Sequence, residues 1–131
     1  MERITTVSLL TTDGRYVRVE PNQRILLAQS GKPDAHTNFE LFLLGGETQV
    51  ALRSVDGAFV SAEGGGHQPL FANRGAAGPW ETFELIAVDN NRFALRAIGG
   101  PFVGVEGFGQ IQHPTPLVLL GEWGRVWDLN S

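Results

Sequence analysis

Hydrophobic and polar residues alternate along several short stretches of the chain. In the segment VALR, Val50 and Leu52 fall on one side of an extended chain, whereas Ala51 and Arg53 fall on the other. The segments VSL at 7–9 and FALR at 93–96 alternate in the same way. A period of two residues is typical of half-buried β-strands, whereas a helix has a period of about 3.6 residues. The pattern therefore predicts an all-β protein in which helix is nearly absent.

A turn signal and a second β-prone segment follow each of these strands. The signals are the dipeptides Asp13-Gly14, Asp56-Gly57 and Gly99-Gly100. Such residues supply the positive φ angles that a two-residue type I′ turn requires, so each dipeptide predicts a β-hairpin. The returning strands are expected at 16–20, 59–63 and 102–106.

Two more short strands follow each hairpin. We expect the third strand of each unit at 25–28, 70–73 and 117–120, and the fourth at 39–44, 83–88 and 127–130. Four strands in each of three units give about twelve strands, with turn signals spaced as in β-sandwiches and β-barrels.

One unit of sequence is used three times. The positions that share a register are Val7, Val50 and Phe93, which lie 43 residues apart, and Phe39, Phe83 and Trp127, which lie 44 apart. Self-similarity at a fixed period indicates a repeat architecture. We therefore predict a single domain, 1–131, built of copies one, two and three at about 5–48, 49–91 and 92–131.

Copy three departs from the other two near its end. Its third and fourth strands begin 10 residues apart, at Leu117 and Trp127, whereas the spacing from Leu70 to Phe83 in copy two is 13. The loop before its third strand, 107–116, is longer. A ligand site that uses this loop would therefore break the threefold symmetry.

Three hairpin units around an axis bury apolar faces that none can bury alone and leave few open sheet edges. The segments VALRSVDGAFVSAE, ANR and GPWETFELI of copy two resemble the fascin-like β-trefoil domains, and the resemblance covers essentially the whole chain. It implies a six-stranded barrel capped by three hairpins, with a pseudo-threefold axis. It also implies relatives that bind actin, and bacterial relatives thought to bind carbohydrate. The chain departs from the actin-binding groups because it holds one trefoil and only three histidines.

Size and charge narrow the classes of partner. A chain of 131 residues is the size of one domain, and its net charge of -4 argues against nucleic acid and weakly against an acidic membrane surface. Its apolar runs are far too short to span a bilayer, and MERITTVSLL lacks the long apolar segment of a signal peptide. We expect a monomeric cytoplasmic protein, although a secreted protein whose signal had been removed would show the same pattern.

The sequence contains no recognisable catalytic or metal-binding motif. It has no cysteine, and His36, His67 and His113 share neither a repeat offset nor a metal-ligand spacing. It also lacks a nucleophile elbow, a phosphate loop and a dinucleotide fingerprint. We therefore expect no catalytic residue, no metal and no cofactor.

Residues that recur in the three copies are expected to serve structure. We expect salt bridges or hydrogen bonds to loops from the repeated charges, which are Glu20, Glu63, Glu106, Arg53 and Arg96. Large apolar residues are expected to fill the core, because they contribute most to burial. The predicted core residues are Phe39, Phe83, Trp127, Val7, Leu9, Val50, Leu52, Phe93, Leu95, Tyr16, Phe59 and Phe102.

Trp80 has two competing interpretations. It follows Gly78-Pro79 just before the last strand of copy two, where copy one has His36. Its ring would either cover the mouth of the barrel or stack on the face of a sugar. Trp123, in the shortened turn of copy three, carries the same ambiguity.

The favoured hypothesis is a lectin-like module that binds a glycan or polysaccharide in copy two. Sugar pockets combine an aromatic platform with a few placed polar groups. The candidate ligand-binding residues are His67, Gln68, Asn73, Arg74, Trp80 and Glu81. An actin-binding protein is the alternative, although actin is itself acidic and its binders normally offer basic patches. A third hypothesis is a structural trefoil without a ligand.

Overall fold

The computed structural model of this protein describes residues 2–11, 15–30, 32, 34–45, 48–62, 70–87, 93–98, 103, 117–121 and 126–129. Within these ranges the only helices are two short 3₁₀ turns, η1 (Ala35–Thr37) and η2 (Pro79–Glu81), as the period of two predicted. The strands are β1 (Glu2–Thr11), β2 (Tyr16–Val19), β3 (Leu26–Ser30), β4 (Asn38–Gly45), β5 (Gln49–Ser54), β6 (Phe59–Ser61), β7 (Phe71–Arg74), β8 (Phe83–Ala87), β9 (Phe93–Ala97), β10 (Leu117–Gly121) and β11 (Val126–Leu129).

The predicted strands coincide with the observed ones to within a few residues wherever the structure describes them. The returning strand expected at 102–106 lies outside the described residues except for Val103. The backbone N–H of Val103 donates to the carbonyl of Leu95 at 2.8 Å. No described helix is long and apolar enough to cross a membrane.

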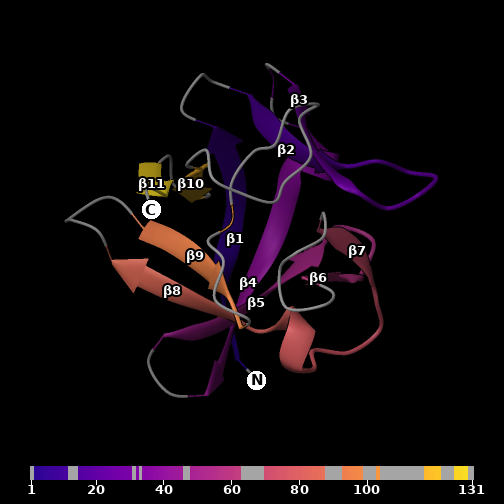
Figure 1. Cartoon of the computed structure of the whole chain (residues 1–131). Coiled ribbons are helices and arrows are strands. Elements are labelled where there is room, and N and C mark those ends of the chain that lie inside the picture. Colours follow the sequence, from indigo (N-terminus) through magenta and orange to yellow (C-terminus); the bar gives the residue numbers. More distant parts are fainter. Residues whose placement is uncertain are drawn as a thin grey trace.

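The strands pair into one curled sheet. β1 pairs with β4, β4 with β5, β5 with β8 and β8 with β9, and every pair is antiparallel. β1 also pairs with β10, β10 pairs with β11, and β11 lies beside β9. The strands β2–β3 and β6–β7 extend this arrangement as hairpins (Figure 1). The strand contacts therefore run round the molecule, with the core inside.

The strand pair that joins copies one and two has the same register as the strand pair that joins copies two and three. Glu40 of β4 lies opposite Arg53 of β5, and Glu84 of β8 lies opposite Arg96 of β9. The two arginines form ion pairs with these glutamates at 2.8 Å and 3.1 Å. The prediction that Arg53 and Arg96 serve structural salt bridges is therefore confirmed.

The core is built from inward-facing residues of all three copies. Phe39 and Phe83, the repeated anchors before the acidic residue and the leucine, are 1% and 0% exposed. The side chains of Trp127, Phe93 and Phe102 lie outside the described residues. The other predicted core residues that are buried are Val7, Leu9, Val50, Leu52, Phe59 and Leu95.

Of the aromatic residues predicted to begin a returning strand in the core, Tyr16 departs from the prediction, whereas Phe59 is buried. In β2 the inward positions are Val17 and Val19, so Tyr16 points the other way and is only half-buried. Its counterpart Phe59 is buried in a separate cluster with Phe42, and the two ring centroids lie 5.8 Å apart. The guanidinium of Arg53 lies over the Phe42 ring at 4.8 Å, which is a cation–π geometry.

The hairpin between β5 and β6 has a three-residue loop, and not the predicted two-residue type I′ turn. Gly57 has a φ of 89°, whereas Asp56 has no positive φ. The backbone N–H of Gly57 donates to the carbonyl of Ser54 at 3.0 Å, and the N–H of Ser54 donates to the carbonyl of Ala58 at 2.8 Å. Only the glycine therefore needs the left-handed conformation. The dipeptides Asp13-Gly14 and Gly99-Gly100 lie outside the described residues.

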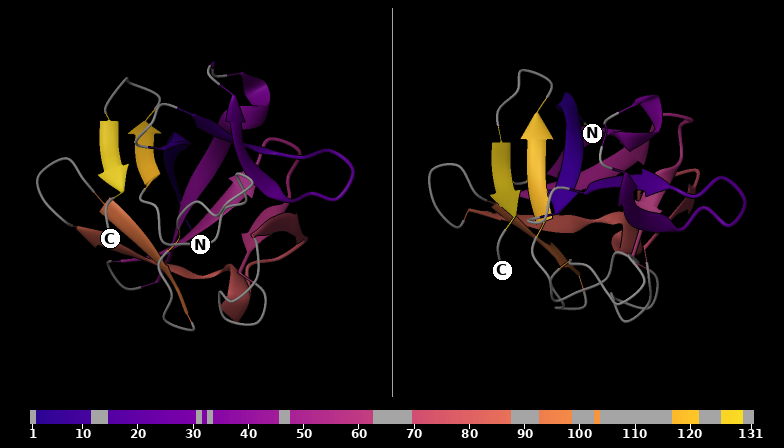
Figure 2. Two further views of the ribbon diagram at one scale, coloured as in Figure 1. Left: turned by 45° about the horizontal axis from the view of Figure 1, so that its top comes forward. Right: turned by 90° about the horizontal axis from the view of Figure 1, so that it is seen from above.

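Copy three breaks the pattern that the other two follow. Its third strand, β10, pairs directly with β1, whereas β3 and β7 pair with β2 and β6 of their own hairpins. Both views in Figure 2 show β10 and β11, in yellow, as a pair beside β1. The third strand of copy three therefore pairs differently from its counterparts in copies one and two, a difference that the repeat did not predict.

Candidate functional site

The two 3₁₀ turns share one hydrogen bond, from the backbone N–H of the residue before the turn to the side chain of its last residue. In η1 the N–H of Asp34 donates to Thr37 Oγ1, and in η2 the N–H of Gly78 donates to Glu81 Oε1, both at 2.9 Å. Because the turns lie 44 residues apart, His36 and Trp80 occupy equivalent positions.

The turn that carries Trp80 is fixed to the neighbouring strand β6. The carbonyl of Trp80 accepts a hydrogen bond from the N–H of Ala62 at 2.7 Å. The carboxylate of Glu81, only 6% exposed, accepts one from Ser61 Oγ at 2.6 Å. A Cβ on Gly78 would lie 3.1 Å from Glu81 Oε1, so the close capping contact favours glycine there. These contacts hold the backbone of Trp80 in one position.

The indole of Trp80 itself faces solvent, with 44% of the residue exposed. It borders a surface depression of about 430 Å³ lined by Arg74, Pro79, Trp80 and Glu81, which we call the Trp80 depression. Arg74 Nε lies 3.8 Å from Glu81 Oε2. An aromatic residue on a fixed turn therefore stands beside a guanidinium at the surface.

A second depression adjoins the first at Arg74. We call it the Arg74 groove; it has a volume of about 570 Å³. Asn73 is exposed along it. The groove is lined by Pro21, Arg24, Asp56, Gly57, Ala58, Ala72, Asn73, Arg74 and Gly75.

The structure brings together four of the six predicted site residues. Arg74, Trp80 and Glu81 line the Trp80 depression, and Asn73 lies in the adjoining groove. Glu81 is buried, and its two oxygens are engaged below the surface. His67 and Gln68 lie outside the described residues, as does Trp123. The ligand-binding role of all six residues stays a prediction.

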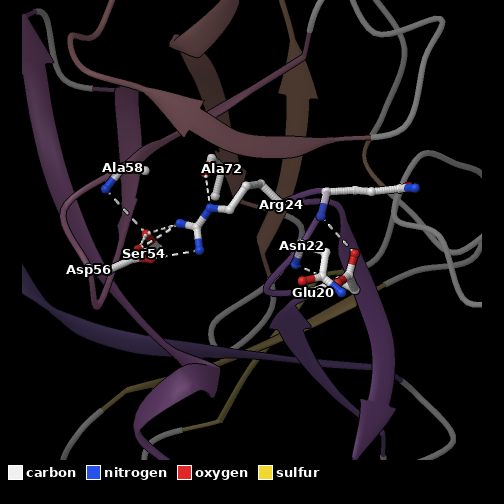
Figure 3. Close-up of polar contacts among 8 residues, drawn as sticks. Glu20, Asn22, Arg24, Ser54, Asp56, Ala58 and Ala72 are labelled. Carbon is white, nitrogen blue, oxygen red and sulfur yellow. Dashed lines mark hydrogen bonds and ion pairs between the residues drawn. The ribbon is translucent and has the colours of Figure 1, made fainter.

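Arg24, which was not among the predicted site residues, connects copies one and two. Its φ is 67°, in the left-handed region that a long side chain rarely adopts. Its backbone carbonyl accepts the N–H of Ala72, and its Nε donates to the carbonyl of Ala72 at 2.9 Å. Its NH1 and NH2 nitrogens contact Asp56 Oδ2 and Oδ1 at 2.6 Å and 2.7 Å (Figure 3). The hairpin loop of copy two is thereby tied to the turn before β3.

The acidic groups around this junction are stabilised in their charged forms. Hydrogen bonds from Arg24 first, and from the Ser54 hydroxyl second, hold the pKa of Asp56 below its ordinary value. The pKa of Glu20 is also lowered, because its carboxylate accepts the backbone N–H groups of Asn22 and Gln23 at 2.6 Å and 2.9 Å (Figure 3). The predicted loop hydrogen bonds of Glu20 are therefore confirmed; Glu63 and Glu106 lie outside the described residues.

A third depression lies on the copy-one side of Arg24. This His36 pocket has a volume of about 240 Å³. Arg18 NH1 at its edge contacts Asp34 Oδ2 at 3.3 Å. The pocket is lined by Arg18, Val19, Pro21, Arg24, His36, Ser54, Val55 and Asp56.

Among the residues that the structure describes, no three histidine or acidic side chains gather in a metal-binding arrangement. The described polar groups of the three depressions are guanidinium, carboxylate, amide, hydroxyl and imidazole groups beside apolar walls. These groups can both donate hydrogen bonds to a ligand and accept hydrogen bonds from it.

The chain was compared with known families, proteins and structures. Residues 40–115 match the family described as "Domain of unknown function (DUF7910)". A search of curated proteins found no match. A designed threefold-symmetric protein, ThreeFoil, superposes with a TM-score of 0.68 at 13% identity, covering 96% of this chain and 89% of that one.

A fungal lectin has the same fold. The Polyporus squamosus lectin, solved bound to the human-type influenza-binding epitope Neu5Acα2-6Galβ1-4GlcNAc, superposes with a TM-score of 0.70 at 10% identity. The match covers 100% of this chain but only 45% of the lectin chain, so this protein spans less than half of that lectin's length. The predicted all-β trefoil fold is confirmed by these structures. The narrower likeness to fascin stays a prediction.

Proposed function

This chain belongs to the DUF7910 family, and we propose that it is a non-enzymatic carbohydrate-binding β-trefoil whose principal site is the Trp80 depression. The observation that carries the proposal is the exposed indole of Trp80 on a turn that is fixed from beneath. A sugar ring presents an apolar face, and an aromatic side chain matches it well. Of the large hydrophobic residues exposed in the described structure, Trp80 is the aromatic one.

The groups around Trp80 supply the polar half of a sugar site. The guanidinium of Arg74 carries several N–H donors, and the amide of Asn73 both donates and accepts hydrogen bonds. Both residues lie along the depressions that meet at Arg74. Stacking on the indole would remove apolar surface from water, while these groups fix the orientation of the hydroxyls.

Glu81 takes a positioning role in this proposal. Its carboxylate is buried and accepts hydrogen bonds from Ser61 and Gly78, so it holds the turn rather than the sugar. A turn fixed before binding loses little conformational freedom when the ligand arrives, which favours affinity. The glycan-bound lectin of the same fold supports the class of ligand, although a fold alone does not determine function.

A glycan array run beside an actin co-sedimentation assay tests the proposal. We expect binding to a subset of glycans and no sedimentation with actin filaments. Binding to actin without binding to any glycan would favour the alternative hypothesis. Failure to bind either would favour a trefoil without a ligand.

A further inference from the structure

The three depressions adjoin one another through lining residues that they share. The Trp80 depression and the Arg74 groove share Arg74. The Arg74 groove and the His36 pocket share Pro21, Arg24 and Asp56. Building on the proposed function, we infer that the ligand is a linear, neutral oligosaccharide that extends from Trp80 across Arg74 and the Arg24–Asp56 pair to His36.

The two equivalent turns place an aromatic side chain at each end of this path, His36 at one end and Trp80 at the other. His36 and Trp80 occupy equivalent positions on 3₁₀ turns that share one hydrogen bond, from the backbone N–H before the turn to the side chain of its last residue. Both side chains are exposed. The junction between copies one and two lies between them, because Arg24 pairs with Ala72 and Asp56 there. Two surfaces for sugar rings are thus connected by a polar groove.

The charges along the path are paired. Arg18 lies 3.3 Å from Asp34 and Arg24 lies 2.6 Å from Asp56. Arg74 lies 3.8 Å from Glu81 at the other end. An arginine beside a carboxylate leaves little net charge to attract an acidic sugar, but the pair still offers donors and acceptors to hydroxyl groups. The path therefore suits neutral sugars.

Residues in the middle of the path offer a sugar both a hydrogen-bonding group and apolar surface. Asp56 keeps 53% of its side chain exposed, so its carboxylate can accept hydroxyl hydrogen bonds while it holds Arg24. Pro21 and Ala58 give apolar surface nearby. Each added sugar unit along the path is therefore expected to add binding energy until the His36 pocket is filled.

The test is the dependence of affinity on chain length. Isothermal titration uses glucose and its β-1,4-linked oligomers up to the hexamer, and the matching α-1,4-linked series. We expect affinity in one series to rise at least about tenfold from monomer to trimer and then to level off. Equal affinity for monomer and trimer, or no binding by any member of either series, overturns the inference.

Substitutions test which residues make the contacts that a longer oligosaccharide gains over the monomer. His36→Ala should lower the affinity for the longest oligomers about tenfold and leave the affinity for the monomer unchanged. Asn22→Ala, an exposed residue of the neighbouring turn that lines none of the three depressions, should change neither. An unchanged affinity for the longest oligomers in His36→Ala overturns the path to His36.

The two proposals fail in different ways. Glycan binding that depends on Trp80 but not on chain length leaves the proposed function standing and ends the inference. Glycan binding that is indifferent to Trp80→Ala ends the proposed function. A glucuronate-containing oligomer that binds more tightly than its neutral counterpart contradicts the paired-charge argument.

Discussion

Arg24 and Asp56 join two repeats through a bidentate ion pair. NH1 of Arg24 lies 2.6 Å from Oδ2 of Asp56, and NH2 lies 2.7 Å from Oδ1. Copy one supplies the arginine and copy two the aspartate. The contact coincides with a left-handed backbone at Arg24, which normally costs about 1–3 kcal/mol and persists only where the surroundings enforce it.

Replacing Arg24 by glycine should therefore destabilise the protein less than replacing it by alanine, which is the reverse of the usual order. We expect Arg24→Ala to lower the free energy of unfolding by about 1–3 kcal/mol, because the hydrogen bonds to Asp56 and Ala72 are lost. Arg24→Gly loses the same bonds but adopts a positive φ without strain, so it should be less destabilising. Urea denaturation of both variants, with Asn22→Ala as a control of small effect, measures this. A larger loss in Arg24→Gly would contradict the strain argument.

Gly57, in the loop between β5 and β6, can be compared with Gly75, which follows β7 and serves as the control. A Cβ at either position meets no atom within 4 Å, but only Gly57 has a left-handed φ. Gly57→Ala should therefore cost about 1–2 kcal/mol of unfolding free energy. Gly75→Ala should range from no change to a gain of about 0.4–1 kcal/mol. Thermal or urea unfolding compares the two, and equal effects would show that the positive φ is not what matters.

Asp56 should make the stability depend on acid. Because its pKa is lowered in the folded state, its contribution is fully present above the unfolded value of about 3.9 and is lost as the pH falls through the folded value. The difference in unfolding free energy between the wild type and Asp56→Asn should therefore be constant near neutrality and shrink below about pH 4. A difference that grows on acidification would contradict this assignment.

The buried Glu81 should tolerate an amide but not truncation. Glu81→Ala removes both acceptors and leaves Ser61 Oγ and the N–H of Gly78 without their partner, at a cost of about 1–3 kcal/mol. Glu81→Gln keeps an oxygen for the N–H of Gly78 and an amide group beside Ser61 Oγ, so it should cost less than Glu81→Ala. Unfolding and glycan titration of both variants test the positioning role. Glycan affinity lost in Glu81→Gln with stability retained would instead indicate direct contact with the ligand.

The strands and the repeat could be predicted from the sequence because they depend on local patterns. The segment Val50–Arg53 lies in β5 as predicted, although Ala51 is buried as well as Val50 and Leu52, and the repeat register is kept in the pairing of Glu40 with Arg53 and Glu84 with Arg96. The location of Trp80 on the turn before β8 could be predicted in the same way, from its position after Gly78-Pro79.

The features that were missed depend on contacts between distant segments. The hydrogen bond from Arg24 to Ala72 spans 48 residues, and nothing in the local sequence marks an arginine for a positive φ. Pro21 and Asn22 indicate only that a turn precedes Arg24. The hydrogen bonds of the Asp56 side chain to Arg24 and Ser54 in the three-residue loop likewise include a contact with a distant segment, which the local Asp56-Gly57 signal could not predict.

The most direct test of the account compares Trp80→Ala with Ile98→Ala. Ile98 is the matched control, since it is also a large exposed hydrophobic residue, at 57%, and lines none of the three depressions. Titration with the strongest glycan from the array should show at least a tenfold loss of affinity in Trp80→Ala, about 1.4 kcal/mol, and no change in Ile98→Ala. Both melting temperatures should stay within a few degrees of the wild type. Unchanged glycan affinity in Trp80→Ala, or unfolding of that variant, would contradict the claim that Trp80 is a platform for sugar.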